Sequence, residues 1–215
     1  MVVDFRFYLI TDRNLCAPRS LQSVVREACD AGVRAVQLRE KDLPRKELEE
    51  YMTRLLAITR DRSAKLLLNR DEPIEGSEDA FLAASLGTSG FHFPEAVPFP
   101  HELRSRFPKL LVGVSAHSPA RAVAAAAEGA DFVTFGPVFE TPSKTGFGPP
   151  QGLDALARVA STVTVPVFAV GGVTTENAAE CVAAGAHGVA VIRAVMTATN
   201  ITDAVHRFEA AIGSL

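Results

Sequence analysis

The feature that most constrains this chain is a regular alternation between short apolar runs and longer stretches of helical periodicity. Eight apolar runs occur along the 215 residues, and each is almost continuously apolar. That pattern is typical of strands buried on both faces of a parallel sheet, because a strand with one solvated face would alternate apolar and polar residues. The expected strands are 7–12, 34–39, 65–69, 90–93, 110–115, 131–135, 165–170 and 188–192.

The stretches between these runs favour helices. Lys46–Ala57 carries apolar residues at helical spacing, and Leu21–Ala31 is followed by a glycine that suits a helix C-terminus. Eight βα units in this length average roughly 27 residues each, which fits a (β/α)8 TIM barrel of the α/β class. A doubly wound open sheet is the alternative, but it favours five or six strands and an early G-x-G-x-x-G motif. Since no linker-like segment divides the chain, we expect one barrel domain over residues 1–215.

Charge and cysteine content exclude several classes of protein. Lys and Arg number 22 against 25 Asp and Glu, for a net charge of −3, so no global cationic field attracts nucleic acid or an anionic membrane. The three cysteines lack C-x-x-C spacing, which argues against a zinc site or a disulfide framework. No apolar run approaches the roughly 20 residues that span a bilayer. We therefore expect a cytoplasmic protein that binds anions through local clusters.

Polar residues follow several of the expected strands, at the end where a TIM barrel carries its active site. Gln37 and Arg39 share one side of the second strand by its two-residue period, and Lys41 lies just beyond them. Asn69 ends the third strand and Ser115 the fifth. A solvated charge cluster and turn formation are the alternative explanations. Arg39 favours a site, since an arginine in a buried strand needs an anionic partner.

Two histidines lie at strand ends. His92 stands between two phenylalanines, which favours packing over catalysis. His117 lies two residues beyond the fifth expected strand and beside two serines. A neutral imidazole there is suited to exchange a proton with a bound substrate.

The loops after the last three strands contain candidate anion ligands. Thr141, Ser143 and Lys144 lie between glycines in the loop after the sixth strand, which predicts a lid over an anion, although a flexible surface loop is the alternative. Gly172 follows the seventh strand, and Gly188 opens the eighth. Loops in this part of a barrel commonly bind phosphate through backbone N–H groups. The residues thus indicate an enzyme with two anion sites, for substrates that carry phosphate and pyrophosphate.

An ordered series of motifs resembles the thiamine phosphate synthase and TenI superfamily and covers nearly the whole chain. The matching segments are Y-L-I-T-D (8–12), Q-L-R-E-K (37–41), G-V-S-A-H-S (113–118), F-G-P-V-F-E-T-P-S-K (135–144), A-V-G-G-V (169–173) and G-V-A-V-I (188–192). In the synthase branch, the resemblance implies, an aminopyrimidine methyl diphosphate ionises with the help of Mg²⁺, and the nitrogen of a thiazole phosphate captures the carbocation.

The resemblance also implies roles for individual residues. Pyrimidine- or pyrophosphate-binding positions match Gln37, Arg39, Lys41, Asn69, Ser115 and Lys144, and thiazole-phosphate positions match Thr141, Ser143, Gly172 and Gly188. The magnesium ligands do not carry over. Arg70 follows Asn69 where the synthase pattern has Asp, with Asp71 shifted by one position, and Val97 stands where it has a second Asp. Asp71 or Glu95 would have to replace them.

These losses resemble the TenI branch, whose thiazole tautomerases move a proton on a carboxythiazole phosphate without releasing pyrophosphate. We therefore predict a tautomerase without a metal, in which His117 is the acid/base residue and Lys144 the second catalytic residue. A Mg²⁺-dependent synthase is the first alternative, because the Q-L-R-E-K cluster is intact. A non-catalytic regulatory protein that binds thiamine phosphates is the second. The expected partners are small phosphorylated substrates, with no nucleic acid or membrane, and the resemblance is compatible with a homodimer.

Overall fold

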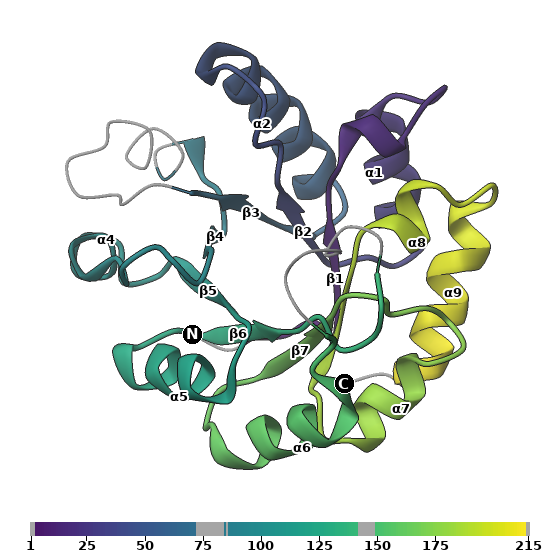
Figure 1. The fold of residues 1–215 in the computed structure, drawn as a ribbon. Helices are drawn as coiled ribbons and strands as arrows, with labels where there is room; N and C mark the ends of the chain where they lie inside the picture. The colour runs from purple at the N-terminus through teal and green to yellow at the C-terminus, as the bar shows by residue number, and fades with distance from the viewer. Residues whose placement is uncertain (1–2, 72–83, 85, 142–148, 214–215) are drawn as a thin grey trace.

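A computed structural model describes residues 3–71, 84, 86–141 and 149–213, and within them eight parallel strands close into a barrel (Figure 1). Each strand pairs with the next along the chain, and β8 pairs with β1, so that Leu9 has both Val36 and Val191 as register partners. The predicted TIM barrel is therefore confirmed. The strands are β1 Phe7–Ile10, β2 Ala35–Leu38, β3 Lys65–Asn69, β4 Gly90–Phe93, β5 Leu111–Ala116, β6 Phe132–Phe135, β7 Val167–Val170 and β8 Gly188–Val191.

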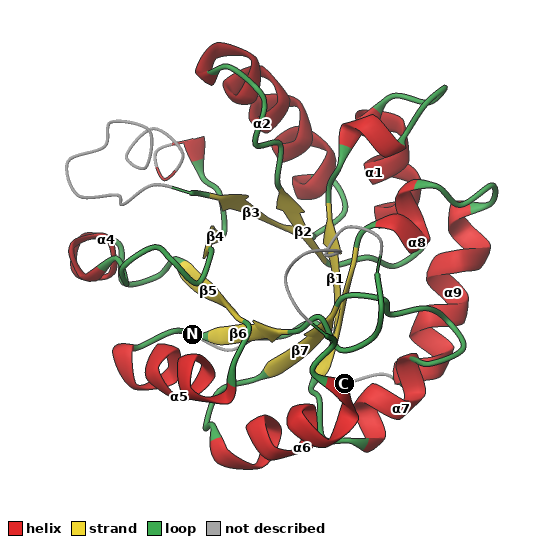
Figure 2. Ribbon diagram, viewed as in Figure 1, coloured by secondary structure: helices red, strands yellow, loops and turns green. Residues whose placement is uncertain are grey.

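The helices lie outside the ring of strands (Figure 2). Polar side chains begin several of them: Ser20 accepts a hydrogen bond from the Ser23 amide, and Asn200 accepts one from the Asp203 amide. The elements are the 3-10 helix η1 Arg13–Leu15 and the α-helices α1 Leu21–Asp30, α2 Arg45–Arg60, α4 His101–Arg106, α5 Pro119–Glu128, α6 Gly152–Thr162, α7 Ala178–Ala183, α8 Arg193–Met196 and α9 Ile201–Ile212. None of the helices in these ranges is long and apolar enough to cross a membrane.

Alternate residues of each strand pack on opposite faces, and both faces are buried. Leu9 and Val36 face the surrounding helices, whereas Tyr8 and Leu67 belong to a separate cluster inside the barrel. Aromatic rings fill the part of that interior nearer the N-terminal ends of the strands. The Phe132 ring centroid lies 5.5 Å from that of Phe168. This packing explains the nearly continuous apolar runs and makes the barrel a filled core with its polar groups at one end.

Candidate active site

A layer of polar side chains lies inside the barrel toward the C-terminal ends of the strands. The Gln37 amide donates to the Tyr8 hydroxyl oxygen at 3.1 Å. His92 Nε2 lies 3.0 Å from the Ser115 hydroxyl and 3.3 Å from the Thr134 hydroxyl. Gln37, His92 and Thr134 are buried. Hydrogen-bonding groups therefore form the floor of the barrel mouth, above the aromatic packing.

Burial makes His92 a neutral imidazole. Burial, with a smaller contribution from the positive charge of Arg39, lowers the pKa of His92 from 6.5 to about 3. The expectation that Gln37 points into the barrel agrees with these contacts, and so does the packing role expected of His92. The side-chain position expected of Arg39 stays a prediction.

His92 should make the stability of the fold depend on pH. The unfolded chain takes up a proton at His92 near pH 6.5, whereas the folded chain does so only near pH 3. The contribution of neutral His92 to the free energy of unfolding is therefore complete above pH 6.5. Below that pH it falls by about 1.4 kcal/mol per pH unit, until the pKa of the folded state is reached. The difference in unfolding free energy between wild type and His92→Gln should shrink by about 2 kcal/mol from pH 7 to pH 5.

Urea unfolding at the two pH values measures that difference. His206→Gln, at an exposed position of α9, is the matched control and should leave the pH dependence of the wild type unchanged. A His92→Gln profile parallel to the wild-type profile would contradict the assignment of a buried neutral histidine.

A buried carboxylate fixes the loop that carries Arg39 and Lys41. Glu40 accepts hydrogen bonds from the Thr11 hydroxyl at 2.7 Å and from the Arg13 amide at 3.1 Å. Thr11 in turn accepts the Arg39 amide at 2.9 Å. The Glu40 side chain is only 2% exposed and is also ion-paired with the Arg13 guanidinium. The β2 loop is thus tied to the β1 loop, a role for Glu40 that we did not predict from the Q-L-R-E-K motif.

The ends of β2 and β3 meet at a cavity of about 300 Å³. Lys41 and Asn69 both line it, and the Asn69 amide donates to the His92 carbonyl at 3.2 Å. Lys41 Nζ lies 2.7 Å from a carboxylate oxygen of Asp71. The structure therefore brings Lys41 and Asn69 together next to the polar layer.

His117 directly follows β5 and is held from two sides. Its Nδ1 donates to the Gly136 carbonyl at 2.5 Å, and its backbone amide donates to the Glu95 carboxylate at 3.1 Å. A carbonyl can only accept, so the neutral ring carries its proton on Nδ1 and its lone pair on Nε2. This arrangement is compatible with proton transfer through Nε2.

Gly172 is required by the backbone. It has φ +69°, and a Cβ there would lie 2.7 Å from the Phe139 Cβ. The β6 loop approaches this closely because the Phe139 amide donates to the Gly171 carbonyl at 3.0 Å. The loops after β6 and β7 are therefore joined where Gly172 was expected to bind phosphate.

Gly188 does not lie with the other predicted site residues. It begins β8, at the end of the barrel opposite the mouth, where a Cβ would collide with the Arg6 carbonyl. Packing of that carbonyl accounts for the glycine, so the position assigned to Gly188 in the phosphate site needs correction. The resemblance assigned Gly188 to a phosphate position, but the glycine lies at the N-terminal end of its strand, away from the end expected to carry the site.

Part of the predicted lid cannot be placed. Ser143 and Lys144 lie outside the described residues, and Thr141 is half-buried at the last described position before them. The lid and the catalytic role of Lys144 stay predictions.

The described residues do not fit a magnesium site. Mg²⁺ requires several oxygen ligands in octahedral geometry. In the described ranges, no three His, Cys, Asp or Glu side chains gather closely enough to hold a metal ion. Asp71 is paired with Lys41, Glu95 accepts the His117 amide, and Val97 is a buried apolar residue. We therefore derive no step through a metal.

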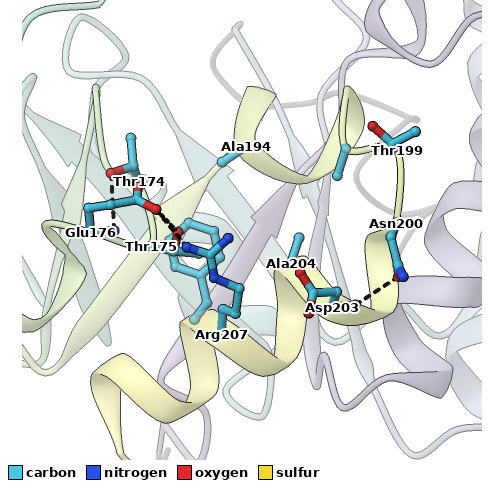
Figure 3. Close-up of a pocket in the computed structure, with 11 residues that line it drawn as sticks. Thr174, Thr175, Glu176, Ala194, Thr199, Asn200, Asp203, Ala204 and Arg207 are labelled. Atoms are coloured by element: carbon cyan, nitrogen blue, oxygen red, sulfur yellow. Dashed lines mark hydrogen bonds and ion pairs between the residues drawn. The ribbon is translucent and has the colours of Figure 1, made fainter.

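A second cavity, of about 380 Å³, lies outside the barrel (Figure 3). Thr174 and Glu176, after β7, form one wall, and Arg207 of α9 reaches across to pair with Glu176 at 2.8 Å. None of the predicted site residues is among the described residues that line it. We therefore place the candidate site at the barrel mouth.

The sequence also matches a known protein family and individual relatives. The model of a family described as thiamine monophosphate synthase matches residues 7–195. A putative thiamine-phosphate synthase of Geobacter sulfurreducens is 43% identical over 90% of this chain and 88% of the relative. A thiamine-phosphate synthase of a Roseiflexus species is 37% identical over 96% of this chain and 85% of the relative.

Solved structures of similar fold cover almost the whole chain. A thiamine phosphate pyrophosphorylase from Pyrococcus furiosus superposes with a TM-score of 0.83 at 29% identity, covering 96% of this chain and 95% of that one. A 3-hexulose-6-phosphate synthase superposes with a TM-score of 0.73 at 17% identity and covers 97% of this chain and 100% of the other. The second likeness shows the fold alone.

Proposed function

The chain belongs to the thiamine monophosphate synthase family of barrel enzymes of thiamine biosynthesis, and from this premise we propose that it is a thiamine-phosphate synthase. It would join an aminopyrimidine methyl diphosphate to a thiazole phosphate. One observation carries the proposal: Lys41 and Asn69 line one cavity at the C-terminal ends of β2 and β3, and the Asn69 amide donates to the carbonyl of His92, a member of the buried polar layer. The names of the relatives support the synthase over the tautomerase that the sequence motifs favoured.

The chemistry follows from these side chains. The bond between the pyrimidine methylene carbon and the diphosphate oxygen breaks, and its electron pair leaves with the diphosphate. The thiazole nitrogen then donates its lone pair to the carbon and forms the new C–N bond. Positive charge at the mouth stabilises the departing anion, and an environment that excludes water strengthens that effect. Gln37 and Ser115 offer hydrogen bonds to the pyrimidine, while the neutral His92 adds no charge that would repel the cation.

Incubation of the protein with both phosphorylated precursors tests the proposal. Mass spectrometry should detect thiamine phosphate at a rate far above that in buffer. The reactions are run both with Mg²⁺ and with EDTA, so that the result does not depend on the metal. Failure to form product both with Mg²⁺ and with EDTA would overturn the proposal.

A tautomerase is the second candidate, and the geometry of His117 favours it. Its Nδ1 proton is fixed on the Gly136 carbonyl, which leaves Nε2 as a base. In that case the protein would accelerate aromatisation of a carboxythiazole phosphate, followed by absorbance, and His117→Ala would remove the acceleration. A non-catalytic binder would instead show calorimetric binding of thiamine phosphates and turn over neither set of substrates.

A further inference from the structure

Tyr8 of β1 is a fully buried phenol at the boundary between the aromatic packing and the polar layer. Its ring centroid lies 5.5 Å from that of Phe132 and 6.0 Å from that of Phe168, so other rings hold it in place. Its hydroxyl oxygen accepts a hydrogen bond from Gln37 Nε2 at 3.1 Å. The rigid ring therefore presents one polar atom to the Gln37 amide.

Burial keeps this phenol neutral. It raises the pKa of Tyr8 well above the ordinary value of 10, and the hydrogen bond from Gln37 opposes that shift only in part. At neutral pH the hydroxyl therefore keeps its proton and offers a lone pair to the Gln37 N–H.

The register of the first two strands indicates which way the Gln37 amide faces. Tyr8 is the register partner of Ala35, two residues before Gln37, so it approaches the amide from the N-terminal side of β2. The nitrogen and oxygen of an amide diverge from one carbon, which places Gln37 Oε1 on the side away from the hydroxyl. Within the described ranges, no side chain donates a hydrogen bond to Oε1. Gln37 is only 1% exposed, and an acceptor on so buried a side chain requires a donor from a ligand.

We propose that Tyr8 is a positioning residue that sets the specificity of the pyrimidine site, because it holds the Gln37 amide with its carbonyl oxygen toward the substrate. The inference rests on the proposed synthase function and on the predicted contact between Gln37 and the pyrimidine. An oxygen in this place accepts a hydrogen bond from an amino group on the ring. An oxo group there is itself an acceptor, so both oxygens would lack a donor and the ring would be rejected.

Phenylalanine at position 8 would remove this constraint and keep the aromatic packing. The Gln37 nitrogen would lose its acceptor, and the amide could then turn over and present either Nε2 or Oε1 to the ligand. Tyr8→Phe should therefore weaken binding of an amino-substituted ring and strengthen binding of an oxo-substituted ring. A general loosening of the core would weaken both.

Calorimetric titration with two pyrimidine methyl phosphates tests this assignment. The two ligands differ only in an amino or an oxo substituent at one ring position. The wild-type Kd for the amino ligand should be at least about 30-fold lower than that for the oxo ligand. Tyr8→Phe should reduce that ratio at least about tenfold. Tyr51→Phe removes the hydroxyl of the other tyrosine, on α2 outside the barrel, and should keep the wild-type ratio.

The nuclear Overhauser effects of the wild-type protein provide a second test that does not depend on a variant being folded. The side-chain NH2 protons of Gln37 should show such effects to the Tyr8 ring and none to the bound amino ligand. Effects from these protons to the ligand would overturn the inference. So would a wild-type preference for the oxo ligand, or a Tyr8→Phe protein, folded by circular dichroism, that binds both ligands in the wild-type ratio.

Failure here can be separated from failure of the proposed function, because the titrations contain no thiazole phosphate and require no turnover. Formation of thiamine phosphate together with an unchanged ratio in Tyr8→Phe would retain the function and lose the inference. Discrimination that depends on Tyr8, without product from the two precursors, would do the reverse.

Discussion

Replacement of Arg39 by alanine is expected to lower kcat/KM for thiamine phosphate formation by at least about 100-fold. The Thr11 hydroxyl, which is itself bonded to Glu40, holds the Arg39 amide in place, and the positive charge of Arg39 contributes to the lowered pKa of His92. A cation fixed in advance near a departing diphosphate stabilises the transition state without reorganisation, so its loss is costly. Steady-state kinetics with both substrates measure the effect.

The control for Arg39→Ala is the conservative variant. Arg39→Lys keeps the charge but not the planar pair of donors, so its kcat/KM should lie between those of wild type and Arg39→Ala. Arg54→Ala, on the exposed face of α2, should retain wild-type activity. Activity of Arg39→Ala within threefold of the wild type would show that the leaving group is held elsewhere.

Gly172→Ala should raise the KM for the thiazole phosphate at least tenfold while changing the KM for the pyrimidine diphosphate less than threefold. The backbone at Gly172 has φ +69°, and an added methyl would contact Phe139 and the Glu140 carbonyl. The β6 and β7 loops must then separate, which changes the shape of the thiazole-phosphate site that we predict between them. Kinetics with one substrate varied at a time separate the two KM values.

Gly152→Ala is the matched control for that substitution. Gly152 has a similar φ of +78°, but nothing lies within 4 Å of a Cβ at this position. Both variants carry the backbone strain of alanine at positive φ, of about 1 kcal/mol. Gly152→Ala should therefore keep both KM values. A similar rise in KM in both variants would mean that strain, and not the loop contact, causes the effect.

The sequence predicted the barrel well because its strands are buried on both faces. The predicted ends of the strands were less accurate, because polar residues that follow the hydrogen-bonded part of a strand serve other roles. Asp12 was expected to end the first strand, but that strand stops at Ile10 and Asp12 accepts the Asn14 amide at the start of η1. The span of the domain over residues 1–215 and the homodimer stay predictions.

The site was predicted in part, for reasons that the geometry makes clear. The two-residue period predicted the inward direction of Gln37 because the strand is regular there. Arg39 follows the end of β2, and its place in the site stays a prediction. Thr134 was missed, although a hydroxyl in the apolar segment 131–135 was a signal for the polar layer. Glu40 was missed because its partners, Thr11 and Arg13, come from another loop that only the closed barrel brings near.

The balance of pyrophosphate and thiamine phosphate tests the central claim most directly. Wild-type protein is mixed with both precursors in EDTA and again with Mg²⁺, and both products are quantified over time. The proposed synthase predicts that the two products form in equal amounts, because each C–N bond formed releases one pyrophosphate. Pyrophosphate release without thiamine phosphate, or formation of neither product in both conditions, would contradict it.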